Sequence, residues 1–150
     1  MTAAERARRY RARLPARGMR LKSVLRPDPL LAAVRFADDT VLSPGEQDVL
    51  RRFCGAFASL PQMPARAAVF GSRARGDSHM HSDLDVAVLV DAPRDPAFEP
   101  ALSAIALAAQ QPYWLGEYGI ALRPVPFYRG EPAAFLHAIR DDLEVIWTRP

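Results

Sequence analysis

Two apolar runs and the polar loop between them constrain the fold of this chain more than any other feature. Residues 67–70 form a short apolar run that leads into Gly71, and residues 83–90 form a second run that is rich in Val and Leu. Both runs have the length and composition of β-strands. The second run opens with two carboxylates, Asp83 and Asp85. Because side chains alternate along a strand, both carboxylates should share one face. The sequence therefore predicts neighbouring strands that carry an acid pair.

The acid pair and the loop before it suggest a site for metal and phosphate. Two carboxylates held this close repel each other, and a divalent cation such as Mg²⁺ or Mn²⁺ would relieve the repulsion, with waters and phosphate oxygens completing the shell. In the loop, Gly71 allows close backbone approach to a ligand, and Ser72 offers a hydroxyl and an N–H group to phosphate oxygens. Arg73 and Arg75 add positive charge. Phosphoryl transfer needs these two parts, because its catalysis is mostly positioning and charge neutralisation.

The remaining pattern predicts a mixed α/β domain, a small mixed sheet with helices packed on it. A helix should begin at Ser43, which can cap it, with Pro44 at the first helical position and Glu46 where a capping box requires it. Pro124 and Pro126 should confine their strand to a sheet edge. Further elements are expected as helices over 101–111 and 131–141 and as strands over 118–127 and 144–148.

The N-terminal segment differs in charge from the rest of the chain. Residues 1–26 hold nine basic residues against Glu5, a net charge of +8, whereas the remainder holds 11 basic and 16 acidic residues, or −5. The segment is a solvated tail or a contact for nucleic acid or a protein partner, and its charge alone leaves both open. Residues 30–36 fit a short strand or one helical turn. We expect a basic, partly disordered extension over 1–42 and a folded domain over 43–150.

Composition also bears on where the protein works. No apolar run approaches the roughly 20 residues that span a bilayer. The Arg-rich N-terminus lacks the apolar segment of a secretory signal. The single cysteine, Cys54, excludes an internal disulfide and fits a reducing compartment. These observations predict a cytoplasmic protein without membrane contact.

The stretch from Val69 to Val88 resembles the signature of the DNA polymerase β-like nucleotidyltransferases, in which Gly-Ser is followed after about ten residues by Asp-x-Asp. Here Gly71 and Ser72 are followed by residues 73–82 and then by Asp83-Leu84-Asp85. In size the chain is similar to the minimal nucleotidyltransferases, which include antitoxins that modify a HEPN-domain toxin.

The resemblance implies the polymerase β-like nucleotidyltransferase fold and metal-dependent transfer of a nucleoside monophosphate, with ATP as the expected donor. It implies that the catalytic residues Asp83 and Asp85 bind two Mg²⁺ or Mn²⁺ ions. The acceptor would be a protein or a small molecule, and the minimal members point to a HEPN-type toxin as a partner. The nucleotide-binding residues expected on this basis are Gly71, Ser72, Arg73, Arg75 and Ser82.

One departure from the family pattern concerns the catalytic step. Active members usually carry a third carboxylate on the strand after the middle helix, where it serves as base for the attacking hydroxyl. Residues 118–126 contain no acid, and Arg123 would repel a metal if it faced the site. Glu117 is the only close alternative. A nucleotide-binding or protein-interaction module that has lost catalysis is therefore the second hypothesis. Trp114 and Tyr113 could stack on a base, although packing in the core or at a helix end is the simpler interpretation.

Overall fold

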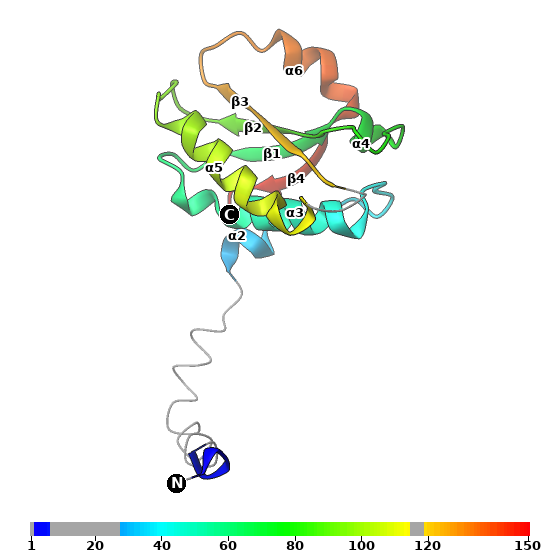
Figure 1. Cartoon of the computed structure of the whole chain (residues 1–150). Coiled ribbons are helices and arrows are strands. Elements are labelled where there is room, and N and C mark those ends of the chain that lie inside the picture. Colours follow the sequence, from blue (N-terminus) through cyan, green and yellow to red (C-terminus); the bar gives the residue numbers. More distant parts are fainter. Residues whose placement is uncertain (1, 7–27, 115–118) are drawn as a thin grey trace.

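The computed structural model describes residues 2–6, 28–114 and 119–150. The strands are β1 (Arg66–Phe70), β2 (Leu84–Val90), β3 (Leu122–Tyr128) and β4 (Glu144–Thr148). They form one sheet of order β3-β2-β1-β4, in which β1 is antiparallel to β2 and β4, and β2 is parallel to β3 (Figure 1). The helices are α2 (Pro29–Ala32), α3 (Pro44–Gly55), α4 (Ser72–Arg75), α5 (Phe98–Gln110) and α6 (Ala134–Ile139), with short 3₁₀ turns at Phe57–Ser59, Gln111–Tyr113 and Arg140–Asp142. The predicted mixed α/β class is confirmed.

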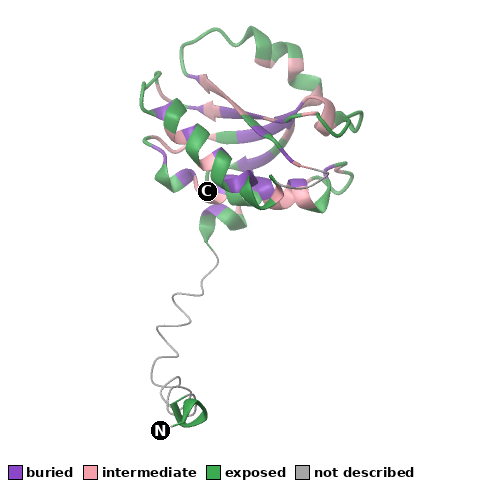
Figure 2. Cartoon of the chain, in the orientation of Figure 1, coloured by how far each residue is buried: buried purple, intermediate pink, exposed green. Residues whose placement is uncertain are grey.

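The main apolar core lies between one face of the sheet and the helices α3 and α5. Buried residues concentrate in the strands and in parts of these two helices (Figure 2). In β2, Leu84, Val86 and Val88 are fully buried and belong to this core. The alternation predicted for this strand is therefore confirmed, since the side chain of Asp85 leaves the sheet on the opposite face.

The second face of the sheet is covered only in part. Phe135 of α6 packs edge-on against Phe70, with 5.6 Å between the ring centroids, and stacks on Phe127 at 6.1 Å. Phe135 is nevertheless 48% exposed, and Val145 of β4 is 49% exposed. In the antiparallel register Phe70 lies opposite Asp85. Asp85 therefore belongs to the less covered face of the sheet, which α6 borders.

Helix α3 begins as its sequence predicts. The Ser43 hydroxyl accepts a hydrogen bond from the Glu46 backbone N–H at 3.1 Å, and the Glu46 carboxylate accepts one from the Ser43 N–H at 2.9 Å. This reciprocal capping box satisfies N–H groups that a helix start would otherwise leave unpaired. Its apolar side, with Val49, Leu50 and Phe53, is fully buried. The helix thus fixes the position of Glu46, which also contacts the candidate site.

Residues 28–42 pack on the domain. A short strand and one helical turn were both open for residues 30–36. The first of these residues belong to the helical turn α2, and Val34, further along the chain, forms an isolated β-bridge with Trp147 of β4. The Trp147 indole N–H donates to the Leu30 carbonyl at 3.0 Å, and Leu30 and Leu42 join the core. The domain boundary at residue 43 stays a prediction, as does the role of the basic residues 7–27, which lie outside the described residues.

Several element ends differ from the sequence-based expectation. β3 lies at a sheet edge, as its prolines predict, but starts at Leu122, and α5 starts earlier than expected, at Phe98. The last helix starts only at Ala134, because Gly130 turns the chain with φ 84° and Glu131 is held in an ion pair with Arg94. No helix in the described part of the chain has the length and apolarity to cross a membrane.

Candidate functional site

The site is built where β1 ends and β2 begins. Because Phe70 lies opposite Asp85, the next residue, Gly71, comes directly against the Asp85 side chain. A Cβ atom added to Gly71 would lie only 2.6 Å from the Asp85 Oδ2 atom. Gly71 also has φ 79° and ψ −161°, a conformation that is essentially restricted to glycine. The loop backbone and the carboxylate are thus in contact, and only glycine permits that contact.

The two carboxylates differ in environment. Asp83 is exposed and lies just before β2, whereas the Asp85 side chain is 15% exposed. Burial raises the pKa of the Asp85 carboxyl; the nearby Arg123 guanidinium offsets this in part, and Asp83 adds to the rise. The buried Asp85 Oδ1 accepts no hydrogen bond from the described residues. The positive charge that faces this oxygen is the Arg123 guanidinium, whose Nε atom lies 2.8 Å away.

Arg123 occupies the position beside this carboxylate on the neighbouring strand. Asp85 and Arg123 are register partners in the parallel pair β2–β3, so their side chains lie on one face of the sheet. Their Nε and Oδ1 atoms are 2.8 Å apart, yet no hydrogen bond is directed along this contact. The described residues hold no group of three or more His, Cys, Asp or Glu side chains suited to a metal. Glu117 lies outside the described residues.

A family model for the nucleotidyltransferase domain matches residues 50–131, which is more than half of the chain. The chain belongs to this family. The matched segment runs from within α3 to just beyond β3 and contains both carboxylates and Arg123. Membership confirms the resemblance to the polymerase β-like nucleotidyltransferases and supports nucleotidyl transfer as the general chemistry. Comparisons with curated proteins and with solved structures find no match.

The residues of this nucleotidyltransferase domain fit a hard divalent cation. Both carboxylates offer oxygen, the ligand that Mg²⁺ and Mn²⁺ prefer. With only Asp83 and Asp85 in the described residues as carboxylate ligands here, most of the coordination shell would come from phosphate oxygens and water. Ser72, the first residue of α4, follows directly after the Gly71–Asp85 contact and is half-buried. The binding of a metal and a nucleotide by these particular residues stays a prediction.

The two arginines of the loop have different surroundings. The Arg73 guanidinium donates to the Ser82 carbonyl at 2.8 Å and to the Glu46 carboxylate at 3.3 Å, and its side chain is only 12% exposed. Arg75 is 44% exposed and pairs with Asp77 and with Asp142. Arg73 thus ties the loop to the start of α3, a role that sequence spacing does not reveal. Phosphate contacts by either arginine remain a prediction.

Ser82 and Trp114 border a hollow at the start of β2. The Ser82 hydroxyl accepts a hydrogen bond from the His79 N–H at 3.0 Å. A cavity of about 250 Å³ lies beside it, lined in part by Met80 and Trp114. Trp114 is 59% exposed, so it does not pack in the core; packing at the helix end stays a prediction for this residue. Its neighbour Tyr113 does pack there, with its hydroxyl 2.8 Å from Asp48.

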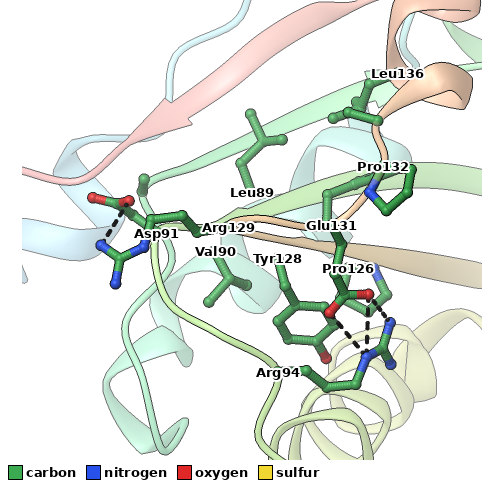
Figure 3. A pocket seen from close by; sticks show the side chains of 13 residues that line it. Leu89, Val90, Asp91, Arg94, Pro126, Tyr128, Arg129, Glu131, Pro132 and Leu136 are labelled. Carbon is green, nitrogen blue, oxygen red and sulfur yellow. Dashed lines mark hydrogen bonds and ion pairs between the residues drawn. The ribbon is translucent and has the colours of Figure 1, made fainter.

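Another cavity is separate from the acid pair. It has a volume of about 450 Å³ and lies at the far end of β2 and β3, where Leu89, Tyr128 and Leu136 line it (Figure 3). Its charged side chains are paired with one another, as in the ion pair between Arg94 and Glu131 at 2.8 Å. Since Asp85 is near the opposite end of β2, this cavity is not part of the site described above.

Replacing Gly71 with Ala is expected to destabilise the protein by about 1–3 kcal/mol, because the new side chain meets both an unfavourable φ and the Asp85 carboxylate. Nucleotide affinity should fall as well, since Asp85 must move. Gly130→Ala is the matched control: its φ is also positive, at 84°, but its added Cβ meets no atom within 4 Å. Urea unfolding and calorimetry with a magnesium nucleotide measure the two effects. Equal losses in both variants would show that the Asp85 contact is unimportant.

Proposed function

We propose that this domain transfers a nucleoside monophosphate from a nucleoside triphosphate, with ATP as donor and Mg²⁺ or Mn²⁺ as cofactor. The contact between Gly71 and the Asp85 carboxylate carries the proposal, because it joins a loop suited to phosphates to a carboxylate suited to metal. The cytoplasm, where ATP and magnesium are available, is the compartment that this proposal requires.

Each residue has a stated task in this proposal. Asp83 and Asp85 would hold the metal, which neutralises and orients the phosphates when it is bound. Ser72 would donate its hydroxyl or N–H to phosphate oxygens. The acceptor oxygen forms a bond to the α-phosphorus, the bond to the bridging oxygen breaks, pyrophosphate leaves, and the acceptor proton passes to solvent. No carboxylate of the described residues stands beside Asp85 on β3 to take that proton, so we expect slow transfer.

The acceptor is a protein side chain or a small molecule. The choice of a HEPN-type toxin rests on the resemblance to minimal nucleotidyltransferases, and a nucleic-acid contact rests on the charge of residues 1–26. Neither choice changes the chemistry at the α-phosphorus.

Nucleotide binding without transfer is a second function that one observation favours. Arg123 lies on the strand where the resemblance places the third carboxylate, and its guanidinium is paired with Asp85. A cation at this position cannot accept the proton of an attacking hydroxyl. The domain would then bind a nucleotide or a protein partner without turnover.

One pair of measurements separates these functions. Calorimetry with the α,β-methylene analogue of ATP and Mg²⁺ reports binding, and pyrophosphate release from ATP in the presence of acceptor proteins reports transfer. Binding and release that both vanish in Asp83→Asn support transfer. Binding without release, across acceptors that include a HEPN-domain protein, supports the second function. If the analogue does not bind at all, both proposals fail.

Replacing Trp114 with Ala is expected to weaken nucleotide affinity about 5- to 150-fold, if the exposed indole stacks on the base, because such stacking contributes about 1–3 kcal/mol. The chain has two tryptophans, and Trp147 is 1% exposed. Quenching of tryptophan fluorescence by the nucleotide should therefore come from Trp114. Trp114→Phe keeps a stacking surface and should bind nearly as the parent does. Unchanged affinity in Trp114→Ala would place the base elsewhere.

A further inference from the structure

The two oxygen atoms of the Asp85 carboxylate have different neighbours. The Oδ2 atom lies on the side of Gly71, where an added Cβ would approach to 2.6 Å, whereas the Oδ1 atom lies 2.8 Å from the Arg123 Nε atom. The two side chains are held next to each other by the parallel register of β2 and β3. One oxygen therefore faces the phosphate loop, and the other already has a positive charge beside it.

With one divalent cation bound, this arrangement has the same net charge as a site of three carboxylates with two divalent cations. Asp83, Asp85 and Arg123 together carry a net charge of −1, and one divalent cation would bring the site to +1. Three carboxylates with two divalent cations, the set that the family resemblance implies, also reach +1. A second metal on the Oδ1 side would meet the guanidinium at close range, and the two cations would repel each other.

We propose that Arg123 replaces one metal ion, so that the domain binds its nucleotide with a single divalent cation, held by Asp83 and the Oδ2 atom of Asp85. The guanidinium supplies the other positive charge from a fixed position on β3. This inference rests on the proposed function, because it concerns the cation count of the same nucleotide site. It replaces the expectation of two metal ions that the resemblance alone implies.

The test counts Mn²⁺ ions bound to the chain that is saturated with the α,β-methylene analogue of ATP, by paramagnetic resonance after equilibrium dialysis. The parent should bind one ion per chain, and Arg123→Asp, which completes a third carboxylate, should bind two. Arg129→Asp is the matched control: it directly follows β3, is 61% exposed against 59% for Arg123, and undergoes the same change of charge. It should bind one ion.

Each result decides the matter. Two ions in the parent, or one ion in both the parent and Arg123→Asp, overturn the inference while leaving the nucleotide site intact. No bound analogue in the parent overturns the proposed function, and the inference with it. Arg123→Met adds a measurement that needs no nucleotide: loss of the competing cation should tighten Mn²⁺ binding roughly fivefold, and weaker binding would overturn the inference. This variant also decides the case if Arg123→Asp does not fold.

Discussion

Changing Asp83 and Asp85 together to Asn is expected to abolish metal-dependent nucleotide binding and to leave the fold intact. The amides keep the shape of the carboxylates but lose both formal charges, and a hard cation then has no anionic ligand at these two positions. Calorimetry with the α,β-methylene analogue of ATP and Mg²⁺ measures the loss. The control is the double change of Asp38 and Asp39 to Asn, which removes the same charge from two exposed residues.

Thermal melting without ligand should show that this variant is as stable as the parent or more stable. The pKa of the Asp85 carboxyl is raised, mainly by burial, so the folded state holds this proton to higher pH than the unfolded state does. The folded state therefore binds more protons in the window between the ordinary and the raised pKa, and the parent should lose stability as pH rises through that window. Asn does not titrate. The advantage of the variant should thus appear above the window and vanish below the ordinary pKa.

The combination of lost binding and kept stability distinguishes a functional site from a structural pair. If the double Asn variant binds nucleotide as the parent does, the metal site is not at Asp83 and Asp85. If it unfolds, the acids serve the fold instead, for example by accepting hydrogen bonds from buried backbone donors. A parent that binds but never releases pyrophosphate would keep the site and remove the transfer step.

Local patterns predicted the part of the site that lies within one stretch of chain. The apolar runs at 67–70 and 83–90 correspond to β1 and β2, except that β2 begins at Leu84, so Asp85 lies in the strand and Asp83 just before it. The four residues of α4 were missed, because a single turn inside a polar loop has no apolar periodicity. The final strand was predicted at its observed bounds, Glu144–Thr148, where three residues typical of strands, Val145, Ile146 and Trp147, stand between two polar ones.

The contacts that decide the chemistry join distant segments, and no local pattern predicts them. Arg123 lies beside Asp85 only because β2 and β3 pair in parallel with one particular register. From the sequence alone one can predict only that Arg123 would repel a metal if it faced the site. Leu30 joins the core through Trp147, at the other end of the chain. A capping residue such as Glu46 is recognisable in sequence, but its second contact, to Arg73, is not.

Replacing Arg73 with Ala is expected to lower the free energy of unfolding by about 3 kcal/mol, because the nearly buried Glu46 carboxylate then loses the cation beside it. The side chains of Arg73 and Glu46 are only 12% and 8% exposed, so water screens the pair little. The loop also loses the bond from Arg73 to the Ser82 carbonyl. Arg75→Ala is the matched control in the same loop: its ion pairs are exposed, and their loss should cost about 0–1 kcal/mol.

A second change separates the ion pair from the other contacts of Arg73. Adding Glu46→Gln to Arg73→Ala removes the unpaired charge and keeps a side chain that can complete the capping box. The double variant should therefore recover part of the lost stability, and urea unfolding of the parent, both single variants and the double variant gives the coupling energy. If Arg73→Ala lowers the free energy of unfolding no more than Arg75→Ala does, the Arg73 guanidinium contributes little to the fold and is available to bind a phosphate. A loss of nucleotide affinity in that stable variant would then return Arg73 to the phosphate-binding residues that the sequence predicts.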